Sequence, residues 1–383
     1  MGEPAPARLA WERALPLYRT QYRADDVERV RGTLADLTTA GSLTPTCAGP
    51  DRGSPPWHCW THGPAVRGEP VPGGRSATGA GWLQDTADGR FPGPSRRTVV
   101  TTTWFITGAS RGFGVEIARQ ALDRGDNVVA TARNPSTVEK ALPGHEDRLL
   151  AVALDVTDEA QAREAVAAAV ARFGRIDVLV NKAGRGLLGA VEEATDAAAR
   201  AVYDTNVFGV LNVLRAALPV LRAQRSGRIL NISSVGGFSG SAGWGVYCST
   251  KFAVEGCSEA LRTEVAPLGI AVTIVEPGYF RTDFLDTTSL DAAELHPIDD
   301  YAQTSGAMRA AVPSINHAQP GDPVKGAAAI LHVADLDDPP LRVQLGSDCG
   351  AGLEAKIARL QADAAEYRAL ALSTDHDDTL TTA

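Results

Sequence analysis

Strand and helix signals alternate from residue 101 to about residue 275, and this alternation constrains the fold more than any other feature. Each expected strand is a nearly continuous apolar run, which is typical of strands buried on both faces. Strands separated by helices predict a parallel sheet covered by helices on both sides, an α/β fold of the doubly wound, Rossmann type. The strands are expected at 102–107, 127–132, 148–154, 176–180, 228–232 and 270–275, and the main helices at 112–124, 159–173, 197–223 and 247–266.

The first 99 residues differ from the rest of the chain in composition. Between residues 41 and 99, Pro and Gly account for 20 of 59 positions, a share above the 25–30% or so that marks low-complexity sequence. Only a short helix over 25–37 is expected there. We predict that 1–99 is an irregular extension: either it is not part of the functional protein, with translation starting near Val100, or it is an interaction arm.

The remainder is predicted to form a single catalytic domain. Residues 100–285 supply its nucleotide-binding part, and 286–372 supply a substrate lid and the closing elements of the same domain. The closing elements are expected as a helix over 324–334, a strand over 341–345 and a helix over 353–370. Residues 373–383 are expected to be a frayed tail.

Charge and cysteine usage exclude several classes of protein. The formal net charge of −9 argues against nucleic acid or an anionic membrane surface as the main partner. No apolar run reaches the 18 or so residues that a membrane span needs, and the N-terminus lacks a secretory signal. Five cysteines without a Cys-x-x-Cys pair do not predict a disulfide framework. We expect a cytoplasmic protein that binds no metal, because His58-Cys59-x-x-His62 lacks an evident fourth ligand.

A glycine-rich turn joins the first expected strand to the first helix. Its glycines allow the backbone to turn sharply and to approach a diphosphate at the helix N-terminus. In this context the turn predicts dinucleotide binding rather than an ordinary loop. The residues expected to contribute are Gly108, Ser110, Arg111, Gly112, Phe113 and Gly114.

The second strand indicates which dinucleotide is bound. It ends at Arg133 without the carboxylate that binds the ribose hydroxyls of NAD, and Arg111 adds a second cation. Two arginines favour the 2′-phosphate of NADP(H), with NAD(H) as the weaker alternative. The other interpretation is that both arginines are exposed surface charges.

Tyr247 and Lys251 are spaced to form a proton-transfer site. Residues four apart share one face of a helix, which places an ammonium beside a phenol. A neighbouring cation lowers the pKa of a phenol towards the range that a general acid/base needs. The spacing also occurs by chance on solvated helices, so the neighbouring motifs decide between the two interpretations.

The ordered motifs resemble those of the short-chain dehydrogenase/reductase family over about residues 101–285. They are Thr-Gly-x-x-x-Gly-x-Gly from Thr107, Asp155, Asn181-x-Ala183-Gly184, Asn206, Ser234, Tyr247-x-x-x-Lys251 and Pro277-Gly278. The resemblance implies an enzyme that moves a hydride between NADP(H) and a secondary alcohol/carbonyl substrate. It also implies pairing of the long helices in a homodimer or homotetramer.

The resemblance also implies a role for each matched residue. Tyr247 is the acid/base, Lys251 lowers its pKa and binds the nicotinamide ribose, and Ser234 polarises the carbonyl group. Asn206 holds a water that links Lys251 to solvent. The remaining cofactor contacts are implied at Asp155, Val156, Asn181, Ala183, Gly184, Pro277, Gly278 and Thr282. The alternative from another class is a non-catalytic NADP(H)-sensing regulator or scaffold.

One residue departs from the family pattern. The family usually has Asn-Asn-Ala-Gly after the fourth strand, whereas this chain has Asn181-Lys182-Ala183-Gly184. The ammonium either points away from the cofactor or crowds its channel. We expect Lys182→Asn to change the affinity for NADPH by less than about tenfold, since the rest of the motif is retained.

Overall fold

The computed structural model describes residues 101–291 and 296–376. The predicted extension 1–99, with its helix over 25–37 and the His58-Cys59-x-x-His62 group, lies outside the described residues. So do residues 377–383 of the predicted tail.

A seven-stranded, all-parallel sheet forms the centre of the described chain, with the strand order β3-β2-β1-β4-β6-β7-β9. The first strand pairs on both sides, since Phe105 is opposite Val129 of one neighbour and Leu179 of the other. The order reverses at β1, as in a doubly wound fold, which confirms the predicted fold class. The strands are β1 (Thr103–Ile106), β2 (Asn127–Ala132), β3 (Leu149–Ala153), β4 (Val178–Asn181), β6 (Gly227–Ile232), β7 (Ile270–Pro277) and β9 (Arg342–Leu345).

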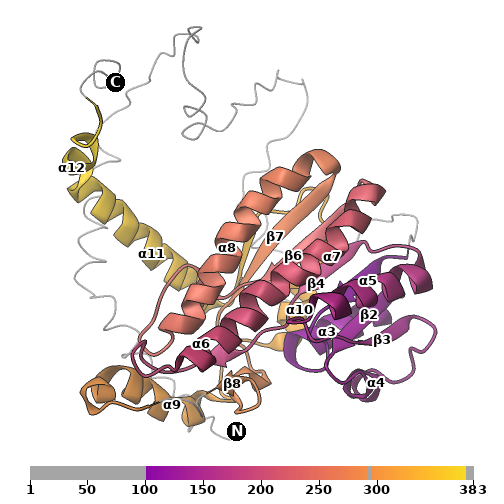
Figure 1. Cartoon of the computed structure of the whole chain (residues 1–383), viewed down its shortest axis with the longest axis horizontal. Helices are drawn as coiled ribbons and strands as arrows, with labels where there is room; N and C mark the ends of the chain where they lie inside the picture. The colour runs from indigo at the N-terminus through magenta and orange to yellow at the C-terminus, as the bar shows by residue number, and fades with distance from the viewer. Residues whose placement is uncertain (1–100, 292–295, 377–383) are drawn as a thin grey trace, which may run out of the picture. The chain divides into compact units, whose positions relative to one another are not determined.

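Side chains alternate between two cores, one on each face of the sheet. Trp104 and Ile106 point to the first core and Phe105 to the second, and all three are fully buried. This alternation follows from the pleat of the strand. Figure 1 shows the helices lying on both faces. The first core is covered by α3 (Gly112–Asp123), α4 (Ser136–Ala141) and α10 (Pro323–Asp335), and the second by α5 (Glu159–Phe173), α7 (Gly209–Gln224) and α8 (Gly245–Val265).

The helix expected over 197–223 is continuous but not uniform. It consists of α6 (Asp196–Tyr203), a π-helical turn over Asp204–Phe208, and α7. The stretch Asp196–Gln224 is long and apolar enough to cross a membrane by length and composition alone. Its buried residues Val213 and Leu221 belong to the second core, which accounts for the apolar character of α7.

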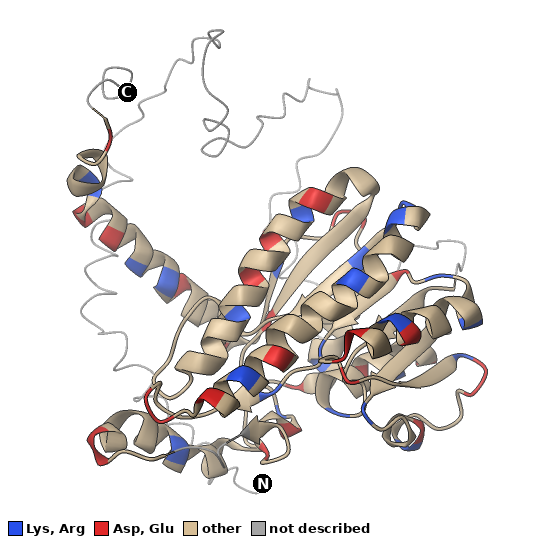
Figure 2. Ribbon diagram, viewed as in Figure 1, with Lys and Arg blue, Asp and Glu red and all other residues tan. Residues whose placement is uncertain are grey.

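The chain after β7 adds elements that the sequence pattern did not predict. A two-stranded parallel ribbon joins β5 (Gly186–Leu187) to β8 (Leu290–Asp291), and α9 (Ala307–Ile315) follows. The predicted closing elements appear as α10, β9 and α11 (Ser347–Glu366), after which the short α12 (Arg368–Leu372) extends the chain. Acidic and basic residues are interspersed along α11 (Figure 2).

A buried ion pair fastens the segment containing α9, the predicted lid, to the loop after β5. Glu193 is fully buried and accepts hydrogen bonds from the Arg309 guanidinium, 2.9 Å for Nη2 to Oε1, and from Ser305. It also accepts the backbone N–H groups of Ala190 and Ile298. These bonds, with Arg309 first, lower the pKa of Glu193 to about 2. The lid is therefore held by a satisfied, ionised carboxylate.

Candidate active site

A cavity of about 760 Å³ opens at the carboxyl ends of the sheet strands. This is the edge at which doubly wound folds bind their ligands. The cavity is lined by residues from the turn after β1, the ends of β4, β6 and β7, the start of α8, the lid and the start of α11. Ten of the predicted site residues line it: Arg111, Gly112, Phe113, Gly184, Ser234, Tyr247, Lys251, Pro277, Gly278 and Thr282.

Tyr247 lies in the first turn of α8 and is buried at the cavity wall. Burial raises the pKa of its phenol well above the usual value, and a hydrogen bond with Ser234 acts in the opposite direction. The charge argument from Lys251 predicted a lowered pKa. In the structure the desolvation of the phenolate dominates, so the phenol carries its proton at neutral pH.

Lys251 lies one helical turn after Tyr247 on the same face. Its ammonium is 6.0 Å from the centroid of the Tyr247 ring and donates a hydrogen bond of 2.8 Å to the Ile232 carbonyl oxygen. Burial lowers the pKa of Lys251 to about 8, and the charge of Lys182 lowers it further. The predicted pair is thus brought together, with both groups desolvated.

Asn206 lies in the π-helical turn between α6 and α7 and is fully buried. Its amide nitrogen donates to the Arg185 carbonyl oxygen (2.9 Å) and to Thr250 Oγ1 (3.1 Å), and its oxygen accepts from the Arg185 N–H. A Cβ at Gly184 would lie 3.2 Å from Asn206 Oδ1 and 3.8 Å from Lys251 Nζ. Asn206 therefore sits beside Lys251 without lining the cavity, and its predicted water-holding role stays a prediction.

Two adjacent serines after β6 point in different directions. Ser234 lines the cavity, and its Oγ accepts the N–H of Gly236 at 3.1 Å. Ser233 also lines the cavity, but its Oγ lies against Glu255, where a Cβ at Gly237 would meet both side chains. Ser234, rather than Ser233, is therefore the hydroxyl beside Tyr247, as the thirteen-residue interval predicted.

The turn after β1 leaves room and donors for an anion. A Cβ at Gly114 would lie 2.3 Å from the Gly108 carbonyl oxygen, so only glycine fits this close approach. Gly112 has a φ of +55°, and Thr282 lies across the space beside it. No side chain caps α3, and its first turn contains no acidic residue. These features fit the diphosphate of a dinucleotide.

The predicted adenosine-side residues are placed around the ends of β2, β3 and β4. Arg133 is exposed directly after β2, and Asp155 Oδ1 accepts the N–H and the hydroxyl of Thr157 at 3.0 and 2.8 Å. Asn181 donates to Asn231 Oδ1 at 2.8 Å in the interior. Val156, Asn181 and Ala183 surround a small separate recess next to Thr107. These residues are therefore near the cofactor edge but do not line the main cavity.

Arg111 is placed differently from Arg133. Its guanidinium donates hydrogen bonds to Thr288, 2.6 Å to Oγ1 and 3.1 Å to the carbonyl oxygen. Thr288 lies after β7, at the start of the predicted lid segment. Arg111 therefore links the glycine turn to this segment in the structure, whereas Arg133 is the exposed cation at the end of β2.

The segment after β7 closes the side of the cavity at which the nicotinamide is predicted to bind. Gly278 donates its N–H to the Leu345 carbonyl oxygen at 2.8 Å, and Asp348 accepts the Tyr279 N–H at 2.7 Å. A Cβ at Gly278 would lie 2.3 Å from Asp348 Oδ1. The start of α11 thus packs directly against the Pro277-Gly278 backbone.

Aromatic and apolar side chains form the wall next to Tyr247. Its ring lies 5.6 Å from that of Trp244 and 5.5 Å from that of Phe284. Leu285 and Met308 belong to the same buried cluster. The sequence pattern did not predict that Trp244 and Phe284 lie here, because the contacts depend on how the segment after β7 folds back over α8.

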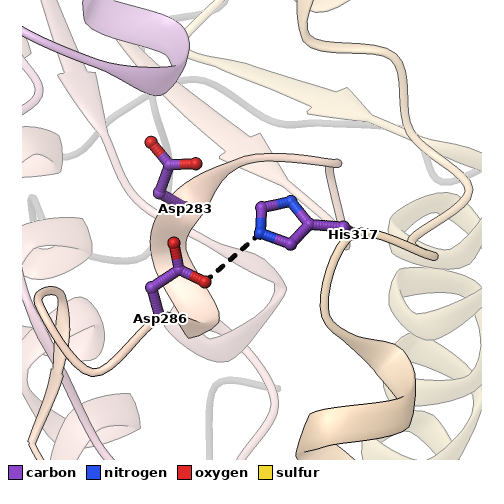
Figure 3. Close-up of side chains that lie close together, drawn as sticks. All are labelled: Asp283, Asp286 and His317. Carbon is purple, nitrogen blue, oxygen red and sulfur yellow. Dashed lines mark ion pairs between the residues drawn. The ribbon is translucent and has the colours of Figure 1, made fainter.

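A second group of side chains lies at the base of the lid. Figure 3 shows Asp283, Asp286 and His317 close together, with the His317 Nε2 atom 3.3 Å from Asp286 Oδ1. One ligand atom from each lies within 4.8 Å of the others. Asp286 also accepts from the Asn316 amide at 2.5 Å. These contacts connect the start of the lid to its end.

Sequence reasoning also missed a buried carboxyl pair behind the cavity wall. Glu255 of α8 and Glu276 of β7 lie on either side of the Arg342 guanidinium, and burial raises the pKa of both, that of Glu276 to about 7. Arg342 lies 3.2 Å from Glu255 and 3.3 Å from Glu276. The carboxyl pair lies between α8, which carries Lys251, and β7, which ends at Pro277, so it connects two elements of the site.

Comparisons with known proteins agree on one family. The family model described as short chain dehydrogenase matches residues 102–293. Oxidoreductase BOA17 of Botryotinia fuckeliana is 39% identical over 278 residues, which cover 72% of this chain and 100% of that relative. The 3-ketodihydrosphingosine reductase of Bacteroides thetaiotaomicron is 40% identical over 243 residues, 63% of this chain and 86% of that relative.

Solved structures give the same result. A short-chain dehydrogenase from Streptomyces avermitilis matches with a TM-score of 0.68 and 41% identity, covering 72% of this chain and 100% of that one. Other matching structures, at 28% and 26% identity, contain NADP or NADH. Both nicotinamide cofactors therefore occur among proteins similar to this chain.

Proposed function

This chain belongs to the short-chain dehydrogenase/reductase family and is an oxidoreductase that acts with a nicotinamide cofactor, and we propose that it is an NADP(H)-dependent reductase of carbonyl compounds. One observation carries this proposal: Ser234, Tyr247 and Lys251 line the same cavity as the glycine turn after β1. The acid/base group and the anion-binding turn are then both within reach of one dinucleotide.

The bound nicotinamide would supply or accept the hydride, and the side chains of this chain would handle the oxygen and its proton. Ser234 would donate a hydrogen bond to the substrate oxygen as negative charge develops there. Tyr247 would then transfer its phenolic proton to that oxygen. Because burial keeps the phenol protonated, the resting site is prepared for reduction of a carbonyl group.

The adjacent ammonium balances the charge that proton transfer creates. Lys251 is held in place by the Ile232 carbonyl oxygen, so its charge stays beside Tyr247. The phenolate left after the proton is donated would be stabilised by this cation. Asn206, beside Lys251, would hold the water through which the proton is restored.

The cavity wall indicates the class of substrate. Trp244, Phe284 and Leu285 surround the side of Tyr247 that faces the lid. Such a wall favours a ketone that bears an apolar group. The similarity to a 3-ketodihydrosphingosine reductase supports the same class.

NADPH consumption across a panel of carbonyl compounds tests the proposed function. The panel should contain long-chain ketones, cyclic ketones and sugar-derived carbonyls. Turnover of apolar ketones would support the proposal. Tight binding of NADPH with no turnover of any compound would favour the rival, a non-catalytic sensor on the same fold.

We expect Arg133→Ser to lower kcat/KM for NADPH by about tenfold and to leave kcat/KM for NADH within about twofold, because one charge-assisted contact to the 2′-phosphate is lost. Steady-state kinetics with both cofactors measure the effect. Arg163→Ser, which removes an exposed arginine of α5, is the matched control and should change neither value. Equal losses with NADPH and NADH would contradict selection at the 2′-phosphate.

We expect kcat/KM for NADPH to fall as the pH rises through about 8, because the pKa of Lys251 is lowered to about 8 by burial. Below that pH the Lys251 side chain is protonated and positively charged; above it the side chain loses its proton and its charge. Since kcat/KM reports groups of the free enzyme, a profile from pH 6 to 10 measures this titration. A profile that stays flat to pH 10 would contradict it.

Two further expectations remain proposals. The three cysteines of the described residues, Cys248, Cys257 and Cys349, are free thiols, which supports a reducing, cytoplasmic location. Pairing through α7 and α8 into a homodimer or homotetramer rests on the family resemblance alone. Light scattering in solution would test it.

A further inference from the structure

Lys182 lies directly after β4, at the position where the family usually has asparagine. Its ammonium reaches back beneath the glycine turn and donates to the carbonyl oxygens of Arg111 at 3.2 Å and Gly108 at 3.4 Å. The side chain also lines the main cavity. Lys182 therefore points towards the cofactor channel and not away from it.

The ammonium lacks a counter-ion within contact distance. Among the described residues no carboxylate lies within 4.0 Å of Lys182 Nζ, and both of its hydrogen-bond partners are neutral carbonyls. Burial lowers the pKa of Lys182 to about 8, with Arg111 lowering it further and Asp283 raising it. Lys182 is half-buried and lines the cavity. A partly desolvated cation held only by neutral groups carries a cost, and an anion beside it would reduce that cost.

The surroundings identify the part of the ligand that would be the anion. A Cβ at Gly112 would lie 3.8 Å from Lys182 Nζ and 3.4 Å from Thr282 Cβ, so the ammonium borders the space at the start of α3. That helix has no side-chain cap and no acidic residue in its first turn. Arg133, the cation suited to the 2′-phosphate, is at the end of β2 instead.

We propose that Lys182 is a further cofactor-binding residue, whose ammonium forms an ionic contact with the diphosphate of the dinucleotide while it holds the glycine turn. This inference rests on the proposed function. The asparagine of the family pattern is shorter and neutral, so in this chain the lysine adds a charge to the site. The rival role is structural only, in which Lys182 does no more than fasten the turn through Gly108 and Arg111.

Three variants separate the two roles. Lys182→Met removes both the charge and the hydrogen bonds, Lys182→Asn restores the family residue without the charge, and Lys182→Arg keeps the charge. We expect the Kd for NADPH to rise about ten- to thirtyfold in Lys182→Met, about three- to eightfold in Lys182→Asn, and at most about twofold in Lys182→Arg. Titration of cofactor fluorescence measures each Kd.

Salt and cofactor type sharpen the experiment. Because salt screens an ionic contact, the ratio of Kd values between Lys182→Asn and the unmodified protein should shrink between about 20 mM and 300 mM NaCl. The losses should be equal for NADPH and NADH, which share the diphosphate. Lys325→Met removes an exposed lysine of α10 and is the control, which should bind both cofactors normally.

Each outcome decides the inference. A Lys182→Asn variant that binds NADPH as tightly as the unmodified protein at low salt would leave only the structural role and overturn the proposal. A loss confined to NADPH would assign Lys182 to the 2′-phosphate and would also overturn it. If the unmodified protein bound no dinucleotide, the proposed function would fail separately. Inorganic pyrophosphate, monitored by thermal shift, would then still show whether Lys182 binds a diphosphate.

Discussion

Replacing Tyr247 by Phe is expected to lower kcat for carbonyl reduction by about 10³-fold, because it removes the proposed proton donor. The ring contacts with Trp244 and Phe284 need only the aromatic carbons. The affinity for NADPH should therefore stay within about twofold and the melting temperature should hardly change. Stopped-flow or steady-state kinetics with a saturating ketone would measure the loss.

A neighbouring tyrosine provides the matched control. Tyr203 of α6 donates its hydroxyl to Ser249 of α8, the helix that carries Tyr247, at 2.8 Å, and Tyr203 does not line the main cavity. Tyr203→Phe removes one phenolic hydroxyl against α8 without removing the proposed proton donor. We expect its kcat to stay within about threefold, since the loss is one ordinary hydrogen bond. A Tyr247→Phe variant that keeps more than about a tenth of the normal kcat would refute the assignment of the acid/base.

The sheet was predictable because its signals are local. Buried parallel strands are short apolar runs, and both β2 and α5 begin and end at the residues that the pattern predicted. The glycine turn and the Tyr247–Lys251 spacing are equally local, since each is read within one turn or one helix. Short sequence windows therefore determined the fold class and about a third of the residues that line the cavity.

The fastening of the predicted lid could not be foreseen, because it joins distant parts of the chain. Glu193 and Arg309 are 116 positions apart, and nothing in either neighbourhood indicates that they meet. The π-helical turn that carries Asn206 was also missed, because it interrupts a helix whose apolar pattern is continuous. Single π-helical turns often occur at functional sites, which agrees with the position of Asn206 beside Lys251.

The pKa of Tyr247 shifts in the direction opposite to the one predicted, which shows a limit of reasoning from charge alone. Sequence spacing reveals which charge lies nearby, but it does not reveal how deeply both groups are buried. In the structure burial is the largest influence on the pKa of Tyr247 and raises it, against a hydrogen bond with Ser234. The orientation of Lys182 could not be predicted from its position in the sequence either, because it depends on hydrogen bonds to the carbonyl oxygens of Gly108 and Arg111.

The buried carboxyl pair of Glu255 and Glu276 should make the stability of the fold depend on pH. Glu276 is fully buried and Glu255 nearly so, and the Oε1 atom of each has no hydrogen-bond donor among the described residues. A proton shared by the carboxyl pair would satisfy the acceptors that face each other. At higher pH this proton leaves, and two buried carboxylates then repel one another, with Arg342 as their common counter-charge.

Glu276→Gln should therefore make the free energy of unfolding less dependent on pH. The pKa of Glu276 is raised to about 7 in the folded chain against about 4.3 when unfolded. The folded state thus holds a proton that the unfolded state releases, and the stability from this proton is full below pH 4 or so and lost as the pH rises through 7. The loss amounts to at most about 4 kcal/mol. Urea unfolding at pH 5.5 and 8.5 should show the variant gaining stability over the unmodified protein at the higher pH.

Glu259→Gln, which removes the exposed partner of Arg342, should show no such gain. Parallel pH curves for Glu276→Gln and the unmodified protein would refute the shared proton.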